Sequence, residues 1–272
     1  MNNDFYRVLM SIVLSLSVAL SHAGEVKKMM MMHPVYGRVQ VSYEEINGYA
    51  IAEGDIILKK LTPYDTSSKA AIIKLISNRW LSGIVPYQID DHLPQVNRDS
   101  VMKAIALWQQ VTFVKFVPIT KADEERYPDY VIFAPDGGKM CSSYVGRYGG
   151  RQYVQLSSRC TTMITAHEIG HVLGLWHEQS RVDRDSYVRI LWENIEEHAR
   201  YNFEQHLTNG TDYGPYNYQS IMHYSAYAFS KNGEKTIVPL VEGATIGQRD
   251  EISPLDIQAV NSMYPEQFKK DE

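Results

Sequence analysis

Three histidines spaced four and then six residues apart are the residues of this sequence best suited to chemistry. The segment HEIGHVLGLWHEQSRVDRD contains His167, His171 and His177, three of the nine histidines in the chain. Side chains four residues apart in a helix lie on one face, so the first two rings can reach the same ion. Imidazole nitrogens are ligands that zinc prefers. The spacing therefore favours a metal site over a surface helix that happens to be rich in histidine.

The elements around these histidines can bring the third one to the first two. A helix that begins at Thr161 or Thr162 would end close to Gly174, because helices commonly end at a glycine in the left-handed conformation. The chain turns sharply there and can return His177 to the ion. Glu168 adjoins the first ligand and could hold a water molecule. Three protein ligands and one open position are typical of a catalytic zinc site, not of a structural one.

The rest of the chain predicts an α+β domain around this helix. Apolar and β-branched runs predict strands at residues 113–118, 130–135 and 151–156. Apolar residues at helical spacing predict a helix over residues 97–112, with Asn97 as its N-cap. Ser253, Pro254 and Asp256 are typical of an N-cap, a first helical residue and a capping box. They predict a helix near the C-terminus.

Composition argues against two classes of partner. The 272 residues can bury a core in one large or two small domains. The net charge of −5 argues against nucleic-acid binding, which needs a basic face. No apolar run reaches the ~18 residues of a membrane-spanning helix. We therefore expect neither a nucleic-acid partner nor a membrane span.

The first 23 residues have the pattern of a secretory signal peptide. Arg7 precedes the apolar stretch VLMSIVLSLSVAL, and small residues allow cleavage after Ala23. An anchor or a buried core helix is the alternative. Export, to the periplasm or out of the cell, would place Cys141 and Cys160 in an oxidising compartment, where we expect them to pair. Two free buried thiols are the alternative to that disulfide.

Residues 24–69 are patterned differently from the C-terminal two thirds of the chain. In the stretch YAIAEGDIILKKL, Glu53, Gly54 and Asp55 interrupt apolar residues and predict a turn between two short strands. The polar stretch TPYDTSSKA then has the composition of a linker. We therefore place a domain edge or processing site near Lys69, with one compact domain after it.

The extended motif resembles that of the astacin family of zinc endopeptidases. The pattern HExxHxxGxxHExxRxDRD is followed by a Met-turn, SIMHY, and both are typical of this branch of the metzincins. The stretches AAIIKLISNRWLSGIVPY, CSSYVGRYGGRQYVQL, TIVP and IGQR are also similar to the family. The resemblance implies a twisted mixed β-sheet with the active-site helix in an N-terminal subdomain. It also implies a mostly irregular C-terminal subdomain with a terminal helix.

The resemblance implies a role for each residue of the motif. The three histidines would bind one zinc ion per chain. Glu168 would be the general base that takes a proton from the zinc-activated water and passes it to the leaving amine. Met222 would form an apolar floor beneath the metal, and His223 would be structural. Tyr224 would be an additional zinc ligand that swings away to stabilise the tetrahedral oxyanion.

Substrate-binding residues are also implied. Gln152 and Val154 lie on a strand similar to the edge strand that pairs with an extended protein or peptide substrate. Arg249 occupies the place of a basic residue that lines the S1′ pocket, which would favour an acidic residue after the scissile bond. An ordinary surface arginine, neutralised by the acidic residues that follow it, is the alternative.

Residues 24–69 would correspond to an inhibitory propeptide. Asp55 lies in AEGD, a partial match to the family's F-x-G-D motif with Ala52 in place of the aromatic residue. It would be a zinc ligand in the zymogen only; a plain turn is the alternative. Cleavage by an activating protease would free a new N-terminus that folds toward Glu178. Residues 70–272 would then be the catalytic domain.

One departure and two alternatives accompany the resemblance. Family members usually have two disulfides in this domain, whereas here only the equivalent of Cys141–Cys160 can form, as expected of a minimal, bacterial form. A thermolysin-like peptidase would instead use a downstream glutamate as third ligand; the candidates are Glu193, Glu196 and Glu197. A zinc-binding protein without catalysis would not need Glu168. Gly174 and His177 argue against the former, and the intact Glu168 against the latter.

Overall fold

The fold is α+β, as the sequence predicts. The computed structural model describes residues 25–33, 37–61, 78–138, 140–205 and 212–266. A nine-stranded mixed sheet has the order β1-β2-β3-β4-β8-β9-β7-β5-β6, and β10 and β11 form a second sheet. The strands are β1 (Lys27–His33), β2 (Gly37–Ile46), β3 (Tyr49–Ala52), β4 (Ile56–Lys60), β5 (Ile84–Ile89), β6 (Lys115–Pro118), β7 (Tyr130–Pro135), β8 (Cys141–Ser143), β9 (Arg151–Leu156), β10 (Val188–Ile190) and β11 (Ile237–Pro239). The α-helices are α1 (Gln95–Val111), α2 (Thr162–Val172) and α3 (Pro254–Met263).

The main core lies between the larger sheet and helices α1 and α2. Strand β7 is buried almost throughout because both of its faces are covered. Val131 and Phe133 belong to the main core with Trp108 of α1, and the alternate residues of β7 belong to a separate apolar cluster. The indole nitrogen of Trp108 donates a hydrogen bond to the carbonyl of Ala166, 2.8 Å away, which fixes α1 against α2. None of the helices in the described part of the chain is long and apolar enough to cross a membrane.

The prediction that Asn97 caps α1 is wrong. The helix begins at Gln95 after Pro94, and Asn97 lies inside its first turn. The Asn97 amide nitrogen donates to the carbonyl of Ser157 at 2.9 Å, so this buried side chain links the helix to another segment. A polar residue at the start of an apolar pattern was therefore mistaken for a cap.

The prediction that residues 151–156 form an edge strand is also wrong. Strand β9 pairs with β7 on one side and with β8 on the other. Val154 is fully buried in the main core, and the amide of Gln152 bonds to the carbonyl of Gly146 at 2.9 Å. Both side chains are buried, and the short antiparallel strand β8 takes the backbone edge of β9 at residues 154–156.

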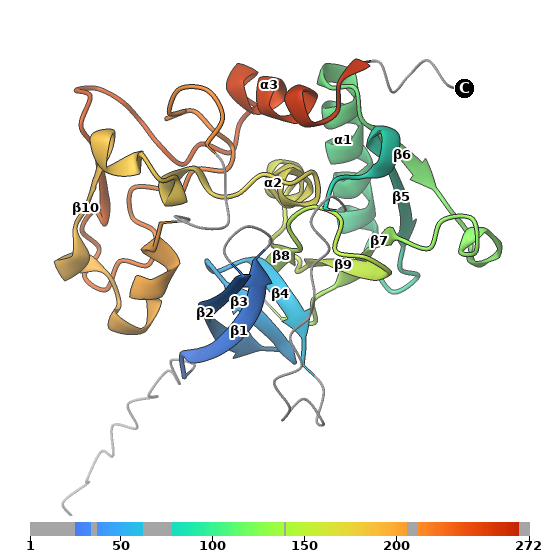
Figure 1. Ribbon diagram of the computed structural model, residues 1–272, viewed down its shortest axis with the longest axis horizontal. Helices are drawn as coiled ribbons and strands as arrows, with labels where there is room; N and C mark the ends of the chain where they lie inside the picture. The colour runs from blue at the N-terminus through green and yellow to red at the C-terminus, as the bar shows by residue number, and fades with distance from the viewer. Residues whose placement is uncertain (1–24, 34–36, 62–77, 139, 206–211, 267–272) are drawn as a thin grey trace, which may run out of the picture.

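Strands β1 to β4 form antiparallel hairpins that extend the sheet. The predicted turn at residues 53–55 is confirmed, since it joins β3 to β4. Strand β4 meets β8 in a parallel pair, with Ile56 opposite Ser143. Figure 1 shows these strands, in blue, below α2 and between the two halves of the remaining chain. The N-terminal segment therefore occupies the edge of the sheet formed by the rest of the chain.

The predicted pairing of the two cysteines is confirmed. Cys141 on β8 and Cys160 before α2 form a disulfide with a sequence separation of 19. A closed loop of this length stabilises a fold by about 3 kcal/mol in the chain-entropy model. The disulfide ties the covering strand β8 to the start of the helix that carries the histidines.

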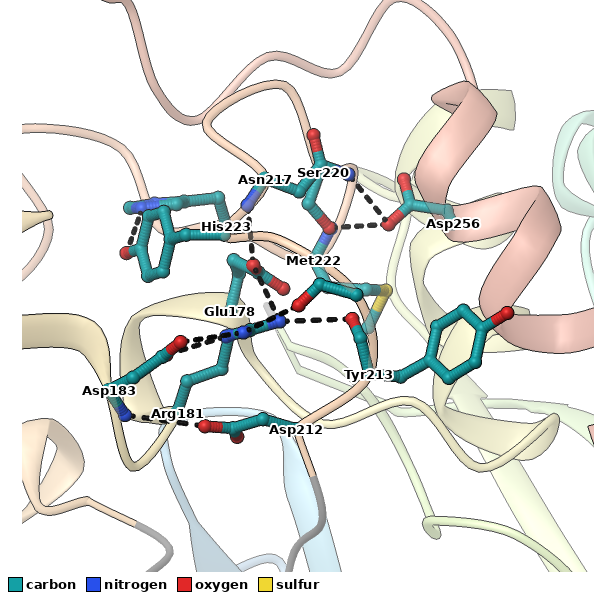
Figure 2. Close-up of polar contacts among 12 residues, drawn as sticks. Glu178, Arg181, Asp183, Asp212, Tyr213, Asn217, Ser220, Met222, His223 and Asp256 are labelled. Carbon is teal, nitrogen blue, oxygen red and sulfur yellow. Dashed lines mark hydrogen bonds and ion pairs between the residues drawn. The ribbon is translucent and has the colours of Figure 1, made fainter. Parts of the chain in front are cut away.

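The C-terminal helix α3 starts as the sequence predicts and also holds a distant turn. Ser253 and Asp256 form the capping box, with Pro254 in the first turn. The buried Asp256 carboxylate also accepts hydrogen bonds from the Ser220 hydroxyl at 2.6 Å and the Ile221 amide at 2.9 Å (Figure 2). One carboxylate therefore satisfies both a helix N-terminus and the start of the predicted Met-turn.

We expect Asp256→Ala to lower the free energy of unfolding by about 3 kcal/mol or more. The substitution leaves several buried donors without an acceptor, and hydrogen bonds to a charged group contribute about 1.5–3 kcal/mol each. Urea unfolding measures the loss. The exposed Asp91→Ala variant is the control and should change stability by less than about 0.5 kcal/mol. A similar, small effect of both variants would contradict the role of Asp256.

Candidate metal centre

Helix α2 and the turn after it place the three histidines as expected. The hydroxyl of Thr161 caps the helix by accepting the amide of Ile164. Gly174 has a φ of +106°, a backbone conformation that residues with a side chain rarely adopt. Its amide donates to the carbonyl of His171, 2.8 Å away, as the chain reverses. The reversal brings His177 to the face of α2 that carries His167 and His171.

Four side chains converge on one point. Ligand atoms of Asp55 and the three histidines all lie within 4.8 Å of one another. The Asp55 carboxylate is 3.3 Å from Nε2 of His167, 3.3 Å from Nε2 of His177 and 3.6 Å from Nε2 of His171. Asp55 comes from the β3–β4 turn, more than a hundred residues before the helix. The cluster thus joins the N-terminal segment to the domain that follows it.

Each histidine is oriented by a partner at its other ring nitrogen. Nδ1 of His167 lies 2.8 Å from the carbonyl of Ile221, and Nδ1 of His171 lies 2.8 Å from the carbonyl of Leu175. Nδ1 of His177 lies 2.7 Å from the carboxylate of Glu53. An acceptor at Nδ1 places the proton of a neutral ring there and leaves the Nε2 lone pair for a metal.

The buried polar atoms of this cluster fit a zinc ion. Nε2 of His171 and of His177, one oxygen of Asp55 and one of Glu168 are buried without a hydrogen-bond partner. Such atoms are rare in folded proteins, and lone pairs that face a carboxylate require a cation between them. Three imidazole nitrogens and one carboxylate oxygen make the four-coordinate donor set that zinc takes.

Local charge also favours a cation at this point. Burial lowers the pKa of His167 to about 3, so that ring is neutral. Burial alone would lower the pKa of His177 as well, but the carboxylates of Asp55 and Glu53 outweigh it and raise the pKa to about 9. Positive charge at Nε2 of His177, from a proton or a metal ion, is therefore stabilised by the carboxylates of Asp55 and Glu53.

Glu168 lies beside the cluster and is not part of it. Its side chain is buried, and the burial together with the nearby Asp55 carboxylate raises its pKa well above the ordinary value. The Ser143 hydroxyl bonds to the backbone carbonyl of Glu168 at 3.0 Å, and one oxygen of the Glu168 carboxyl group is buried without a hydrogen-bond partner. Such a group suits a proton acceptor, as predicted from the motif.

Met222 packs beneath the helix. A Cβ atom added to Gly170 of α2 would lie 2.6 Å from the sulfur of Met222, so only glycine allows this approach. Met222 is buried in the main core, and its carbonyl accepts the amide of Glu178 at 3.2 Å. His223 is buried and bonded to Tyr216 and to the carbonyl of Tyr224, as expected of a structural residue.

The Tyr224 ring is tilted against the ring of His177, and its hydroxyl points to the N-terminal segment. Its ring centroid is 4.6 Å from that of His177. The hydroxyl donates a short hydrogen bond to the backbone carbonyl of Glu53. The Tyr224 hydroxyl, predicted to be an additional zinc ligand, is therefore bonded to Glu53 in this structure and is not part of the metal-binding cluster.

Glu53 is the site residue that was not predicted. It lies beside Gly54 in the β3–β4 turn, where both residues have a positive φ, and its side chain is buried. The sequence places an acidic side chain two residues before Asp55, which was the available signal. A turn residue is usually exposed, so the inward direction of this carboxylate was not expected.

Glu178 lies in a separate buried network (Figure 2). One of its oxygens accepts the amide of Asn217 at 2.7 Å and lies 3.5 Å from the Arg181 guanidinium, which also pairs with Asp183. Burial raises the pKa of Glu178 to about 7. The predicted activation site and new N-terminus, at residues 69–71, lie outside the described residues.

Arg249 lies close enough to Asp55 and Glu168 to interact with their carboxylates electrostatically. Its guanidinium donates to the carbonyls of His223, at 3.1 Å, and Gln248, at 2.8 Å. Burial lowers its pKa, and the carboxylates of Asp55 and Glu168 act in the opposite direction. Arg249 is therefore a partly buried cation beside the candidate site, not a free surface residue.

The alternative of a downstream glutamate ligand is wrong. Within the described residues, the metal-binding group contains none of Glu193, Glu196 and Glu197. Glu196 instead lies 3.3 Å from His198, on the 3-10 helix Glu197–Phe203. The third histidine takes the place that such a glutamate would need.

Comparisons with known proteins agree with this site. The family model for astacin, a peptidase family, matches residues 72–265. Zinc metalloproteinase nas-4 of Caenorhabditis elegans is 38% identical over 220 residues, which cover 78% of this chain and 68% of nas-4. Zinc metalloproteinase nas-13 of the same species is 39% identical over 189 residues, which cover 68% of this chain but only 41% of nas-13.

A solved structure is similar over the same region. High choriolytic enzyme 1, a hatching enzyme zinc-protease of the medaka fish Oryzias latipes, has 35% sequence identity and a TM-score of 0.61. The match covers 68% of this chain and 92% of that one. Several curated relatives are much longer than the region that they share with this chain. Because the family model matches residues 72–265, which are most of this chain, the chain belongs to the astacin family of zinc metalloendopeptidases.

Proposed function

We propose that the protein is a secreted zinc endopeptidase made as a latent precursor. The observation that carries the proposal is the convergence of three Nε2 atoms and the Asp55 carboxylate on one point. Residues 70–272 would cut internal peptide bonds of protein substrates. Residues 24–69 would inhibit them until an activating protease removes the segment. The signal-peptide pattern of residues 1–23, which lie outside the described residues, supports export.

The catalytic roles follow from the positions of two side chains. When bound, zinc would act as a Lewis acid that polarises the scissile carbonyl and makes water a stronger acid. Glu168, whose buried side chain lies beside the metal-binding cluster, would take the proton of the attacking water and deliver it to the leaving amine. The Tyr224 hydroxyl, once released from the Glu53 carbonyl, would donate a hydrogen bond to the oxyanion.

Latency would rest on two contacts of the N-terminal segment. Asp55 would take the open ligand position, where water must bind for catalysis. Strand β4 pairs with β8, and the Ser143 amide donates to the Asp55 carbonyl at 3.0 Å. A substrate that adds a strand needs this same edge. Edge pairing and metal ligation would therefore exclude substrate and water together.

Activation would create a new partner for Glu178. An α-amino group near Ala70 that folds inward would meet a buried carboxylate already held by Asn217 and Arg181. A buried ion pair of this kind needs both members, since an unpaired buried charge is costly. The family match begins at residue 72, close to the proposed cleavage position.

Arg249 would select the residue after the scissile bond. A guanidinium favours a carboxylate through charge-assisted, often bidentate hydrogen bonds. Its position near Asp55 and Glu168 supports a place in the substrate cleft. Its bonds to two backbone carbonyls also fit a purely structural role, which is the alternative.

Replacing Glu168 tests whether its carboxylate is the catalytic base. Glu168→Ala should reduce kcat by several orders of magnitude while the activated enzyme still binds one zinc ion, since the three histidines are unchanged. Activity on a quenched peptide and zinc content by atomic absorption are measured together. Glu193→Ala is the control for loss of a glutamate outside the cluster. If the Glu168 variant kept more than a few per cent of activity, another group would be the base.

Replacing Asp55 tests whether this residue keeps the precursor latent. The Asp55→Ala precursor should hydrolyse a short peptide at least ten times faster than the wild-type precursor, because a ligand position becomes available to water. Mass spectrometry must show that the precursor is still uncut. The double variant Asp55→Ala/Glu168→Ala controls for contaminating activity. An Asp55→Ala precursor as inert and as stable as wild type would contradict the aspartate switch.

Replacing Arg249 tests the preference for an acidic residue after the scissile bond. On a peptide library, the activated enzyme should prefer Asp or Glu immediately after the scissile bond, and Arg249→Ala should lose that preference. Arg249→Lys keeps the charge but not the planar donor pair, so it should retain part of the preference. A wild-type profile dominated by small or apolar residues at that position would refute the pocket role.

A further inference from the structure

Glu53 contacts three groups of the candidate site at once. One carboxylate oxygen lies 2.7 Å from Nδ1 of His177 and accepts the Ser180 hydroxyl at 3.2 Å. Its backbone carbonyl accepts the hydroxyl of Tyr224. We propose that Glu53 is a positioning residue that strengthens metal binding in the precursor and is lost on activation. The inference rests on the proposed zinc site and on the removal of residues 24–69.

The partner of His177 differs in kind from those of the other two ligands. His167 and His171 donate from Nδ1 to neutral backbone carbonyls, whereas His177 faces a carboxylate. A carboxylate at Nδ1 fixes the tautomer and raises the basicity of the ligating nitrogen, and such outer partners typically change metal affinity 10- to 100-fold. The Glu53 carboxylate is buried, so water does not screen it.

The backbone of the β3–β4 turn aims this carboxylate. Glu53 has a φ of +49°, a conformation that costs energy for a residue with a side chain. Gly54 follows at +76°, and a Cβ there would lie 2.7 Å from the ring of Phe229. The turn is thus held against the domain on which Tyr224 and Phe229 lie. A strained residue kept in place by its surroundings is expected where its side chain has a role.

Activation therefore changes the environment of the third ligand as well as the open position. In the precursor, His177 would bind the ion with a carboxylate behind it and Asp55 in front. After cleavage both acidic groups would be gone, and the mature site should hold the ion less tightly. Glu53 would thus help the precursor acquire and retain the metal before activation, and would hold the Tyr224 hydroxyl through its carbonyl.

The test compares zinc affinity in full-length precursors. The zinc dissociation constant is measured by competition with a chelator of known affinity for wild type, Glu53→Gln and Glu53→Ala. Zinc affinity should fall about 10- to 100-fold in Glu53→Ala and by less in Glu53→Gln, which keeps an acceptor without the charge. The visible spectrum of the cobalt-substituted precursor should shift in the same order, since cobalt reports the ligand field directly.

Two controls separate positioning from simple loss of structure. Glu45→Gln changes an exposed propeptide glutamate that pairs with Lys27 at 2.9 Å, and it should leave zinc affinity unchanged. Proteolytic removal of residues 24–69 yields the same mature enzyme from every variant, so the differences should vanish on activation. If Glu53→Ala does not fold, the isosteric Glu53→Gln decides the question.

Zinc affinity within twofold of wild type in the folded variants, with an unchanged cobalt spectrum, would overturn the role of Glu53. A difference that persists after the propeptide is removed would overturn it too. Failure of the proposed latency is a separate result, because an inert Asp55→Ala precursor would contradict the aspartate switch without affecting zinc affinity in the Glu53 variants.

Discussion

The structure depends on three imidazole rings held so that their Nε2 atoms face one another and a carboxylate. Nε2 of His171 and of His177 and one oxygen each of Asp55 and Glu168 are buried without a hydrogen-bond partner, and leaving such atoms unpaired is costly. The fold meets this requirement by fixing each ring from behind, at Nδ1. A bound zinc ion would pair these atoms, and the protein supplies the geometry for it in advance.

The three supports come from three distant parts of the chain. Ile221 is fixed by Asp256 of the C-terminal helix, and Leu175 is placed by the reversal at Gly174. Glu53 comes from the N-terminal hairpin. The turn held by the last helix, the reversal after α2 and the N-terminal hairpin therefore each orient one of the three rings.

Sequence alone was sufficient where the signal is local. The cap at Thr161, the reversal at Gly174 and the capping box at Ser253 depend on residues within one or two turns, and the structure has all three. The site histidines were recognisable because ligand spacing on a helix is itself local. The disulfide followed from the count of two cysteines in a chain with a signal-peptide pattern.

The predictions that failed were decided by tertiary pairing. The resemblance implies that β9 is an edge strand, but β8 pairs with it, so the roles predicted for Gln152 and Val154 do not fit. Asn97 has the chemistry of a cap yet bonds across to Ser157. No local pattern shows that Glu53 turns inward, because its partners are more than 120 residues away in the sequence.

The central claim is tested most directly by anomalous diffraction at the zinc edge from crystals of the uncut precursor. We expect one strong peak per chain, within bonding distance of Nε2 of all three histidines and of the Asp55 carboxylate. In the activated enzyme the peak should remain on the histidines, without an aspartate ligand. A peak at other residues, or a fully loaded precursor in which Asp55 is not a ligand, would contradict the account.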